Sequence, residues 1–99
     1  MNTNIHLDYE KVREAEFIVS TLHHARRQRI LDLLDTYGQM TANHISDEIN
    51  LDRDTTDDHL NMLRRADLVL TNRQGDDIYY SMNEPKLERV TSAVKRFFG

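Results

Sequence analysis

The chain of 99 residues contains no cysteine. The absence of thiols excludes a disulfide framework, a thiolate metal site and a dithiol redox switch. No apolar run approaches the roughly 20 residues that a membrane-spanning helix requires, so no membrane partner is expected. The start of the chain, residues 1–4, lacks both the basic residues and the apolar stretch of a signal peptide. These absences together predict a cytoplasmic protein.

Proline and glycine are also scarce, with one proline and three glycines. So few of these residues leave little room for linkers, and the sequence has no internal repeat. The length is typical of one domain, and we expect residues 1–99 to form it. Glycine-rich phosphate loops, nucleophile elbows and His-Glu-x-x-His helices are absent from the sequence. We therefore expect a protein without enzymatic activity, catalytic residues or a cofactor.

Positive charge is in the minority, because 13 Lys and Arg residues stand against 17 Asp and Glu residues. The net charge of −4, with histidines neutral, argues mildly against a nucleic-acid partner. Domains that bind nucleic acid usually carry a basic surface. The positions of the acidic residues therefore matter more than their sum.

Helical periodicity is the main pattern that the sequence does contain. Side chains suited to helix N-caps precede several of the periodic segments, namely Asp8, Thr41, Asp52 and Asn83. Gly38 suits the left-handed position after a helix end. The spacing of apolar residues and these end signals predict helices over residues 8–22, 25–36, 41–49, 53–65 and 84–98.

One β-hairpin is predicted late in the chain, from residues 68–71 and 78–82, joined by the turn-rich residues 72–77. A short helix, a tight turn and a second helix precede it, which is the order of a helix-turn-helix followed by a wing. We therefore predict a mainly α fold with a small β-hairpin wing (α+β), a winged helix-turn-helix. The side chains expected on the buried face of the hairpin are Leu68, Leu70, Ile78, Tyr80 and Met82.

Several segments resemble the ArsR-type winged-helix transcriptional repressors. The similarity covers roughly residues 10–97, and its strength lies in the joint order and spacing of the motifs. The segments that resemble the family are Arg27-x-Arg29-Ile30-Leu31, Thr41…Ile45…Ile49-Asn50-Leu51-Asp52, His59-Leu60…Leu63…Ala66-Asp67-Leu68-Val69 and Arg73-Gln74-Gly75…Tyr79-Tyr80-Ser81-Met82.

The resemblance implies a homodimer joined by the first and last helices, 8–22 and 84–98. The residues themselves favour a dimer as well, because both terminal helices carry wide apolar stripes that a small monomer covers with difficulty. The alternative is that each helix packs only on its own domain. The residues expected in a dimer interface are Tyr9, Val12, Val19, Leu87, Val90, Val94, Phe97 and Phe98.

The resemblance further implies double-stranded DNA as partner, with the helix 53–65 in the major groove and the wing on the flanking backbone. Arg53 stands where the family often has glutamine, and its guanidinium is suited to guanine O6 and N7. The expected DNA-binding residues are Arg53, Asp54, Thr55, Asp57, Asp58, His59, Asn61, Arg64, Arg65 and Arg73, with further phosphate contacts from Arg26, Arg27 and Thr41.

Acidic residues in the predicted recognition helix conflict with this expectation. Asp54 and Asp57 stand where the family often has serine, and an ionised carboxylate repels phosphate. The helix dipole favours acidic residues in the first turn of a helix, but Asp57 and Asp58 lie beyond that turn. Three interpretations stay open: the carboxylates accept from cytosine N4, Arg64 or Arg65 neutralises them, or this helix does not bind DNA in the standard way.

The third interpretation makes the chain a winged-helix module for protein–protein interaction. Asp76 and Asp77 beside the wing turn support it, since they leave Arg73 as the evident phosphate contact there. The more direct prediction is a sequence-specific transcriptional repressor, a homodimer on a pseudo-palindromic operator, with half-sites about one helical turn apart.

Metal sensing is not predicted. The family's metal sites use cysteines on the first motif helix or Asp and His residues on the last helix, and neither set is present in this chain. His23 and His24 are adjacent and would diverge in a helix, so we expect them in a loop. His59 is expected either to hydrogen-bond within the motif or to touch DNA. An unknown small-molecule or protein effector stays open.

Overall fold

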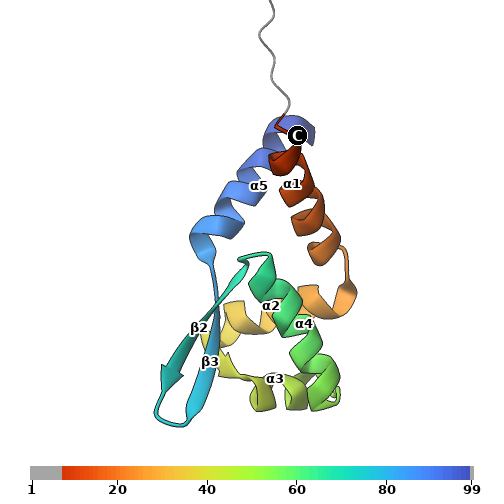
Figure 1. Cartoon of the computed structure of the whole chain (residues 1–99). Coiled ribbons are helices and arrows are strands. Elements are labelled where there is room, and N and C mark those ends of the chain that lie inside the picture. Colours follow the sequence, from red (N-terminus) through yellow and green to blue (C-terminus); the bar gives the residue numbers. More distant parts are fainter. Residues whose placement is uncertain (1–7, 99) are drawn as a thin grey trace, which may run out of the picture.

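The computed structural model describes residues 8–98, with the backbone alone for residues 97 and 98. The predicted helices and hairpin are confirmed, and the fold is mainly α with a small antiparallel sheet (Figure 1). In chain order the elements are α1 (Tyr9–Leu22), α2 (Ala25–Tyr37), β1 (Gln39–Thr41), α3 (Ala42–Ile49), α4 (Arg53–Arg65), β2 (Val69–Gln74), β3 (Asp77–Met82) and α5 (Glu84–Phe98).

The predicted helix ends are formed by the expected side chains. Asp8 accepts hydrogen bonds from the first backbone N–H groups of α1, and Thr41 does so for α3. The Asn83 side chain accepts from the N–H of Lys86 at the start of α5. Such caps satisfy N–H groups that have no partner inside the helix. At the C-terminal end of α2, Gly38 has a φ of 83°, a conformation that favours glycine.

The sheet has three strands in the order β1-β3-β2, all antiparallel. Strand β1 was not predicted, because three residues are too short for an alternating pattern; it places the buried Met40 opposite Tyr80. The wing strands are longer than predicted, since β2 and β3 pair as far as Gln74 with Asp77. The turn is therefore short and contains Gly75, whose φ is 65°.

The predicted buried face of the hairpin is correct for Tyr80 and Met82 of β3, which pack partly against the core, but its phase is wrong in β2. Val69, 3% exposed, is buried, whereas Leu70 is 46% exposed. Leu68 is fully buried just before the strand begins, and within β2 only Val69 is buried. Because side chains alternate between the faces of a strand, this places Leu70 on the outer face. Ile78 lies near the wing tip, beyond the core, and is exposed as well.

The core lies between the motif helices and the base of the sheet. Two buried threonines in it, Thr21 and Thr56, donate their hydroxyl hydrogen to a carbonyl oxygen four residues earlier, which satisfies the polar group inside the helix. The buried apolar residues are Ile18, Ile30, Leu31, Leu33, Leu34, Met40, Ala42, Ile45, Leu60, Leu63, Ala66, Leu68 and Val69.

The molecule is elongated. Its radius of gyration of 15.9 Å exceeds the value of about 13 Å expected for a compact domain of this length. Helices α1 and α5 extend away from the motif and form the narrow end in Figure 1. Lys86 of α5 lies 3.2 Å from the Glu14 carboxylate of α1, measured from Nζ to Oε1. None of the helices within residues 8–98 is long and apolar enough to cross a membrane.

Candidate nucleic-acid interface

Helix α4 forms the second helix of the motif and packs with one face on the core. Thr56, Leu60 and Leu63 are fully buried on that face, as their spacing predicted. Thr55 and Asp57 are half-buried at its edge. The opposite face carries the exposed side chains of Arg53, Asp54, Asp58, Asn61, Arg64 and Arg65.

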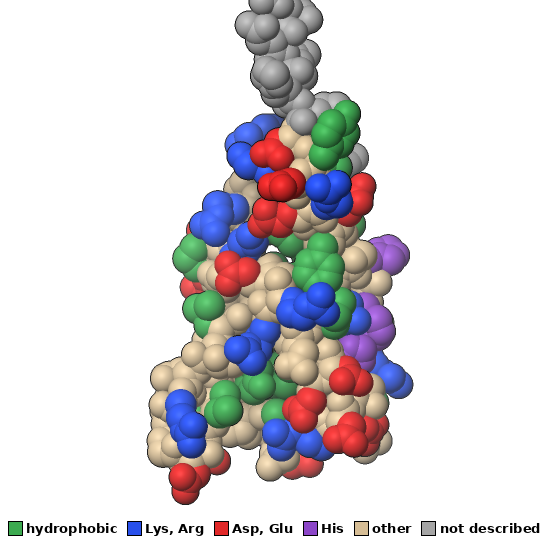
Figure 2. Space-filling model, viewed as in Figure 1, with side chains coloured by type: hydrophobic (Ala, Val, Ile, Leu, Met, Phe, Trp, Pro, Cys, Tyr) green, Lys and Arg blue, Asp and Glu red, His purple; other side chains and the backbone are tan. Residues whose placement is uncertain are grey.

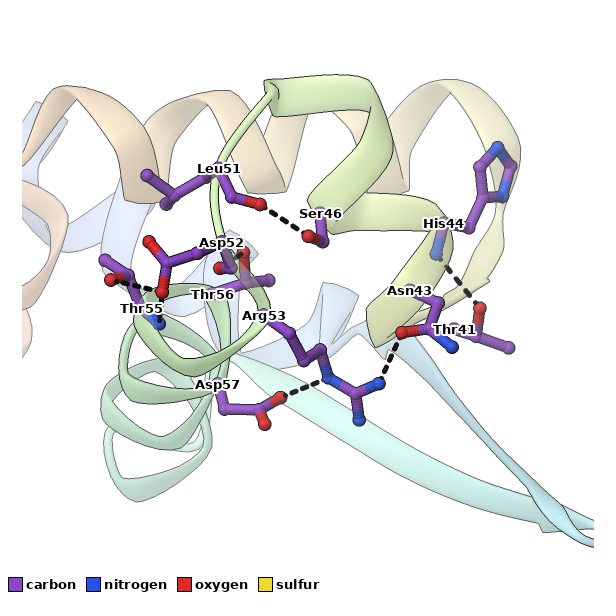
Figure 3. A network of polar contacts seen from close by, with 10 residues as sticks. All are labelled: Thr41, Asn43, His44, Ser46, Leu51, Asp52, Arg53, Thr55, Thr56 and Asp57. Atoms are coloured by element: carbon purple, nitrogen blue, oxygen red, sulfur yellow. Dashed lines mark hydrogen bonds and ion pairs between the residues drawn. The ribbon is translucent and has the colours of Figure 1, made fainter.

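Asp52 is the N-cap of α4, and its carboxylate is exposed. One carboxylate oxygen accepts from both the backbone N–H and the hydroxyl of Thr55, each at 2.9 Å (Figure 3). These two hydrogen bonds lower the pKa of Asp52, because they stabilise its ionised form. Thr55 was predicted to contact DNA, but its hydroxyl donates to this cap.

Arg53 connects the two helices of the motif. Its Nε lies 2.9 Å from Oδ1 of Asp57, one turn further along α4, and its Nη1 donates to the side-chain oxygen of Asn43 on α3 (Figure 3). The arginine side chain stays half exposed, at 51%. The partner that neutralises Asp57 is therefore Arg53 four residues earlier, not Arg64 or Arg65.

His59 does not belong to the exposed surface, which corrects its prediction as a DNA contact. It is 7% exposed, and its Nδ1 accepts from Nε of Arg27 at 3.2 Å. The His24 ring packs edge-on against it with 4.6 Å between ring centres. Of the two alternatives for this residue, the hydrogen bond within the motif is the one observed.

The environment of His59 opposes its protonation. Burial lowers the pKa of His59, and the neighbouring His24, Arg27 and Arg26 lower it further, against a smaller opposite effect of Asp58. Its Nε2 is buried and has no hydrogen-bond partner among residues 8–98. This histidine therefore joins α4 to the start of α2 in its neutral form.

The residues predicted as additional phosphate contacts divide into two groups. Arg27 is half-buried and occupied by His59 and by the backbone oxygen of Thr21, and Thr41 is half-buried in the cap of α3. Arg26 is exposed at the first turn of α2. Arg26 is therefore the member of this set that is free to face a ligand.

The wing carries charges of both signs at its tip. Arg73 is exposed and its Nε donates to the backbone oxygen of Gly75, while Asp76 and Asp77 are exposed beside the turn. Asp76, Asp77 and Arg53 line one hollow between the wing and the motif. Figure 2 shows acidic and basic side chains mixed over this end of the molecule, without one continuous acidic face in this view.

The helices expected at a dimer interface leave apolar side chains exposed. Tyr9 is 65%, Val19 57% and Val94 47% exposed. Val12 is exposed as well, whereas Leu87 and Val90 pack partly against the core. The side chains predicted at the end of α5, Phe97 and Phe98, lie outside the described residues.

Two residues of the interface were missed from the sequence. Asn43 was not singled out in the sequence, and His24 was expected in a loop. His24 is the N-cap of α2, since its Nδ1 accepts from the N–H of Arg26 at 3.2 Å. The spacing of Arg53 and Asp57, four residues apart in a helix, was the available signal for their ion pair. Within residues 8–98, no three His, Asp or Glu side chains are grouped so that they could hold a metal ion.

Comparisons with known proteins agree with this geometry. Residues 22–72 match a family described as a helix-turn-helix domain. The chain is similar to the transcriptional repressor SdpR of Bacillus subtilis, with 40% identity over 73 residues, covering 74% of this chain and 80% of SdpR.

Two solved structures are similar over most of the chain. NolR from Sinorhizobium fredii has 25% identity and a TM-score of 0.76, covering 100% of this chain and 98% of that protein. A winged helix-turn-helix DNA-binding domain from Mycobacterium bovis, described as homodimeric and as a possible ArsR-family regulator, has 22% identity and a TM-score of 0.78, covering 94% of this chain and 86% of that one. This chain therefore belongs to the ArsR-type winged helix-turn-helix family and is a DNA-binding transcriptional regulator.

Proposed function

We propose that this chain acts as a homodimeric transcriptional repressor that binds a pseudo-palindromic operator, with α4 in the major groove. The observation that carries the proposal is the hollow shared by Arg53 and the wing tip. A duplex lying against α4 there meets the wing as well, so one surface serves both base and backbone contacts. SdpR is named a repressor, which supports this direction of regulation.

The contacts are assigned by exposure and chemistry. Arg53 contacts bases, because its guanidinium is half exposed at the start of α4 and suits guanine. Asn61, Arg64 and Arg65 continue the exposed face of α4. Arg26 and Arg73 supply phosphate contacts beside it, which position the protein without reading sequence.

The dimer rests on the exposed apolar residues of α1 and α5. Tyr9, Val12 and Val19 on one helix and Val94 on the other are left uncovered by the rest of the described chain. Covering them with a second copy removes apolar surface from water, which favours association. The homodimeric description of the Mycobacterium bovis domain supports the same arrangement.

The acidic residues weigh less against DNA than their number suggests. Asp52 accepts hydrogen bonds at the start of α4, and Asp57 is paired with Arg53. Asp54 and Asp58 are the exposed acids of this helix that form no ion pair within residues 8–98. Together with the exposed Asp76 and Asp77 at the wing tip, they lower the affinity for every sequence alike, since carboxylates that face the duplex repel phosphate.

The experiment is a selection of bound sequences from a random duplex library at two salt concentrations. We expect an enriched inverted repeat with half-sites about one helical turn apart, and weaker binding at the higher salt concentration. Absence of enrichment, together with no binding to generic duplex DNA, contradicts the proposal. That result would favour the alternative function, a winged-helix module whose exposed acids face a protein partner.

A further inference from the structure

We infer that Asp57 and Asn43 are positioning residues that hold Arg53 in the orientation in which it reads guanine. The inference rests on the proposed function and names how one position of the operator is recognised. In this inference Asp57 affects DNA binding by orienting Arg53. It neither contacts cytosine directly nor serves only to repel DNA.

The geometry holds the guanidinium at two points. Asp57 accepts from Nε within α4, and Asn43 accepts from Nη1 across the turn of the motif (Figure 3). Contacts from two different helices fix the direction of the side chain as well as its distance from α4. The backbone of the helix-turn-helix motif positions both Asp57 and Asn43. Arg53 is therefore held in this orientation before DNA binds.

Enough hydrogen-bond donors remain for a base. A guanidinium has five N–H groups. One on Nε and one on Nη1 are used by the protein, and the Nη2 group has no partner among residues 8–98. The Nη1 and Nη2 pair can therefore still donate two parallel hydrogen bonds to guanine O6 and N7.

Fixing the side chain in advance favours selective binding. A free arginine on the surface loses rotational freedom when it binds, and a side chain held beforehand loses less. The hold also opposes other orientations, in which the guanidinium would turn to the nearest phosphate. Asp57 and Asn43 therefore raise the discrimination between bases more than they raise the affinity for DNA.

The position of Asp57 disfavours direct reading of cytosine. Its Oδ1 lies 2.9 Å from Nε of Arg53, and the residue is only half exposed at the edge of the helix. A contact with cytosine N4 would have to compete with this ion pair. Asp58, by contrast, is exposed and has no ion-pair partner within residues 8–98.

The test uses the full chain and a duplex carrying the selected inverted repeat. Each base pair of one half-site is substituted in turn, and affinity is measured for the wild type, Arg53→Ala, Asp57→Ala, Asp57→Asn and Asn43→Ala. Asp54→Ala is the matched control, because it removes the same charge from the same helix and leaves the contacts of Arg53 in place. Circular dichroism checks that each variant is folded.

We expect the wild type to prefer guanine at one position by about 5- to 150-fold, the range for a bidentate pair. Arg53→Ala abolishes this preference and so identifies the position. Asp57→Ala and Asn43→Ala reduce it at the same position, and Asp57→Asn, which keeps an acceptor oxygen, retains more of it. Asp54→Ala raises the affinity for all sequences and leaves the preference unchanged.

Two results overturn the inference while the proposed function stands. In the first, Asp57→Ala relaxes discrimination at a different base pair from Arg53→Ala, which makes Asp57 a direct reader. In the second, Asp57→Ala behaves like Asp54→Ala, which makes it a repelling charge. Failure to enrich any duplex is a separate outcome that overturns the proposed function together with this inference.

Discussion

Arg27 on α2 donates a hydrogen bond from its Nε to Nδ1 of the buried His59 on α4, with 3.2 Å between the two nitrogens. The contact joins residues 32 positions apart and holds α4 against the start of α2. Because Nδ1 is the acceptor, the neutral ring carries its proton on Nε2. The orientation of α4 in the fold thus depends on an arginine that sequence reasoning assigned to DNA.

Replacing Arg27 with alanine is expected to destabilise the fold. The substitution leaves the buried Nδ1 of His59 without a donor, and such an unsatisfied group costs about 1–3 kcal/mol. Urea denaturation followed by circular dichroism measures the change in the free energy of unfolding. Arg29→Ala is the control, since Arg29 is exposed on the same helix. Equal stabilities of the two variants would show that the hydrogen bond contributes little.

Acidification is expected to destabilise the protein through His59. Its pKa is lowered in the folded state, chiefly by burial, while the unfolded chain titrates near the ordinary value of about 6.5. Between these values the unfolded state binds more protons, so stability is full above about pH 6.5 and is lost as the pH falls towards the folded pKa. The melting temperature should therefore decrease from about pH 7.5 to about pH 5.5.

The variant His59→Gln removes this titration and should show a weaker dependence of the melting temperature on pH. His44→Gln is the matched control, because His44 is exposed on α3. It should keep the pH dependence of the wild type. A profile that changes with His44→Gln and not with His59→Gln contradicts the assignment to the buried ring.

A charge placed in the apolar surface of α5 is expected to separate the proposed dimer. Val94→Glu puts a carboxylate on an exposed apolar position that a second copy would cover. Light scattering after size exclusion should give the mass of one chain, 11.7 kDa, for this variant and twice that value for the wild type. Ser92→Glu is the control, because position 92 lies about 200° away around the helix. Dimers of unchanged stability in Val94→Glu would place the interface elsewhere.

The wing arginine is expected to contribute affinity without selectivity. Arg73→Ala removes one proposed phosphate contact per subunit, so binding should weaken by a similar factor for operator and generic DNA. The slope of log affinity against log salt concentration should become less steep by about 1 for each phosphate that the protein no longer neutralises. Asn72→Ala, an uncharged and exposed position of the same strand, should leave the slope unchanged. A loss confined to the operator would assign Arg73 to base reading.

Much of the fold follows from local sequence signals. Asp8, Thr41, Asp52 and Asn83 cap the helices that they were predicted to cap, because capping depends on the few residues around each end. Gly38 likewise ends α2 with a positive φ. The buried face of α4 was predicted correctly, because the spacing of Leu60 and Leu63 places both residues on the same face of a helix.

The features that were missed depend on contacts between distant segments. For His59 the sequence left open a hydrogen bond within the motif or a DNA contact, and only the positions of Arg27 and His24 decide between them. Asn43 has no evident role until the turn of the motif brings it to Arg53. The phase of β2 depends on whether pairing with β3 begins at residue 68 or 69. The sequence does not decide this, because the adjacent Leu68 and Val69 are both apolar and either could face the core.

In the proposed dimer, the projecting helices α1 and α5 would link the stability of the folded chain to its own concentration. Outside the ion pair of Lys86 with Glu14, much of the apolar surface of this pair remains uncovered within one described chain. In the proposed dimer a second copy covers that surface, and a partner that binds only the folded state stabilises it by mass action. Dilution would then loosen the terminal helices before the motif itself, so a regulator of this design becomes both less stable and less able to span two half-sites as its concentration falls.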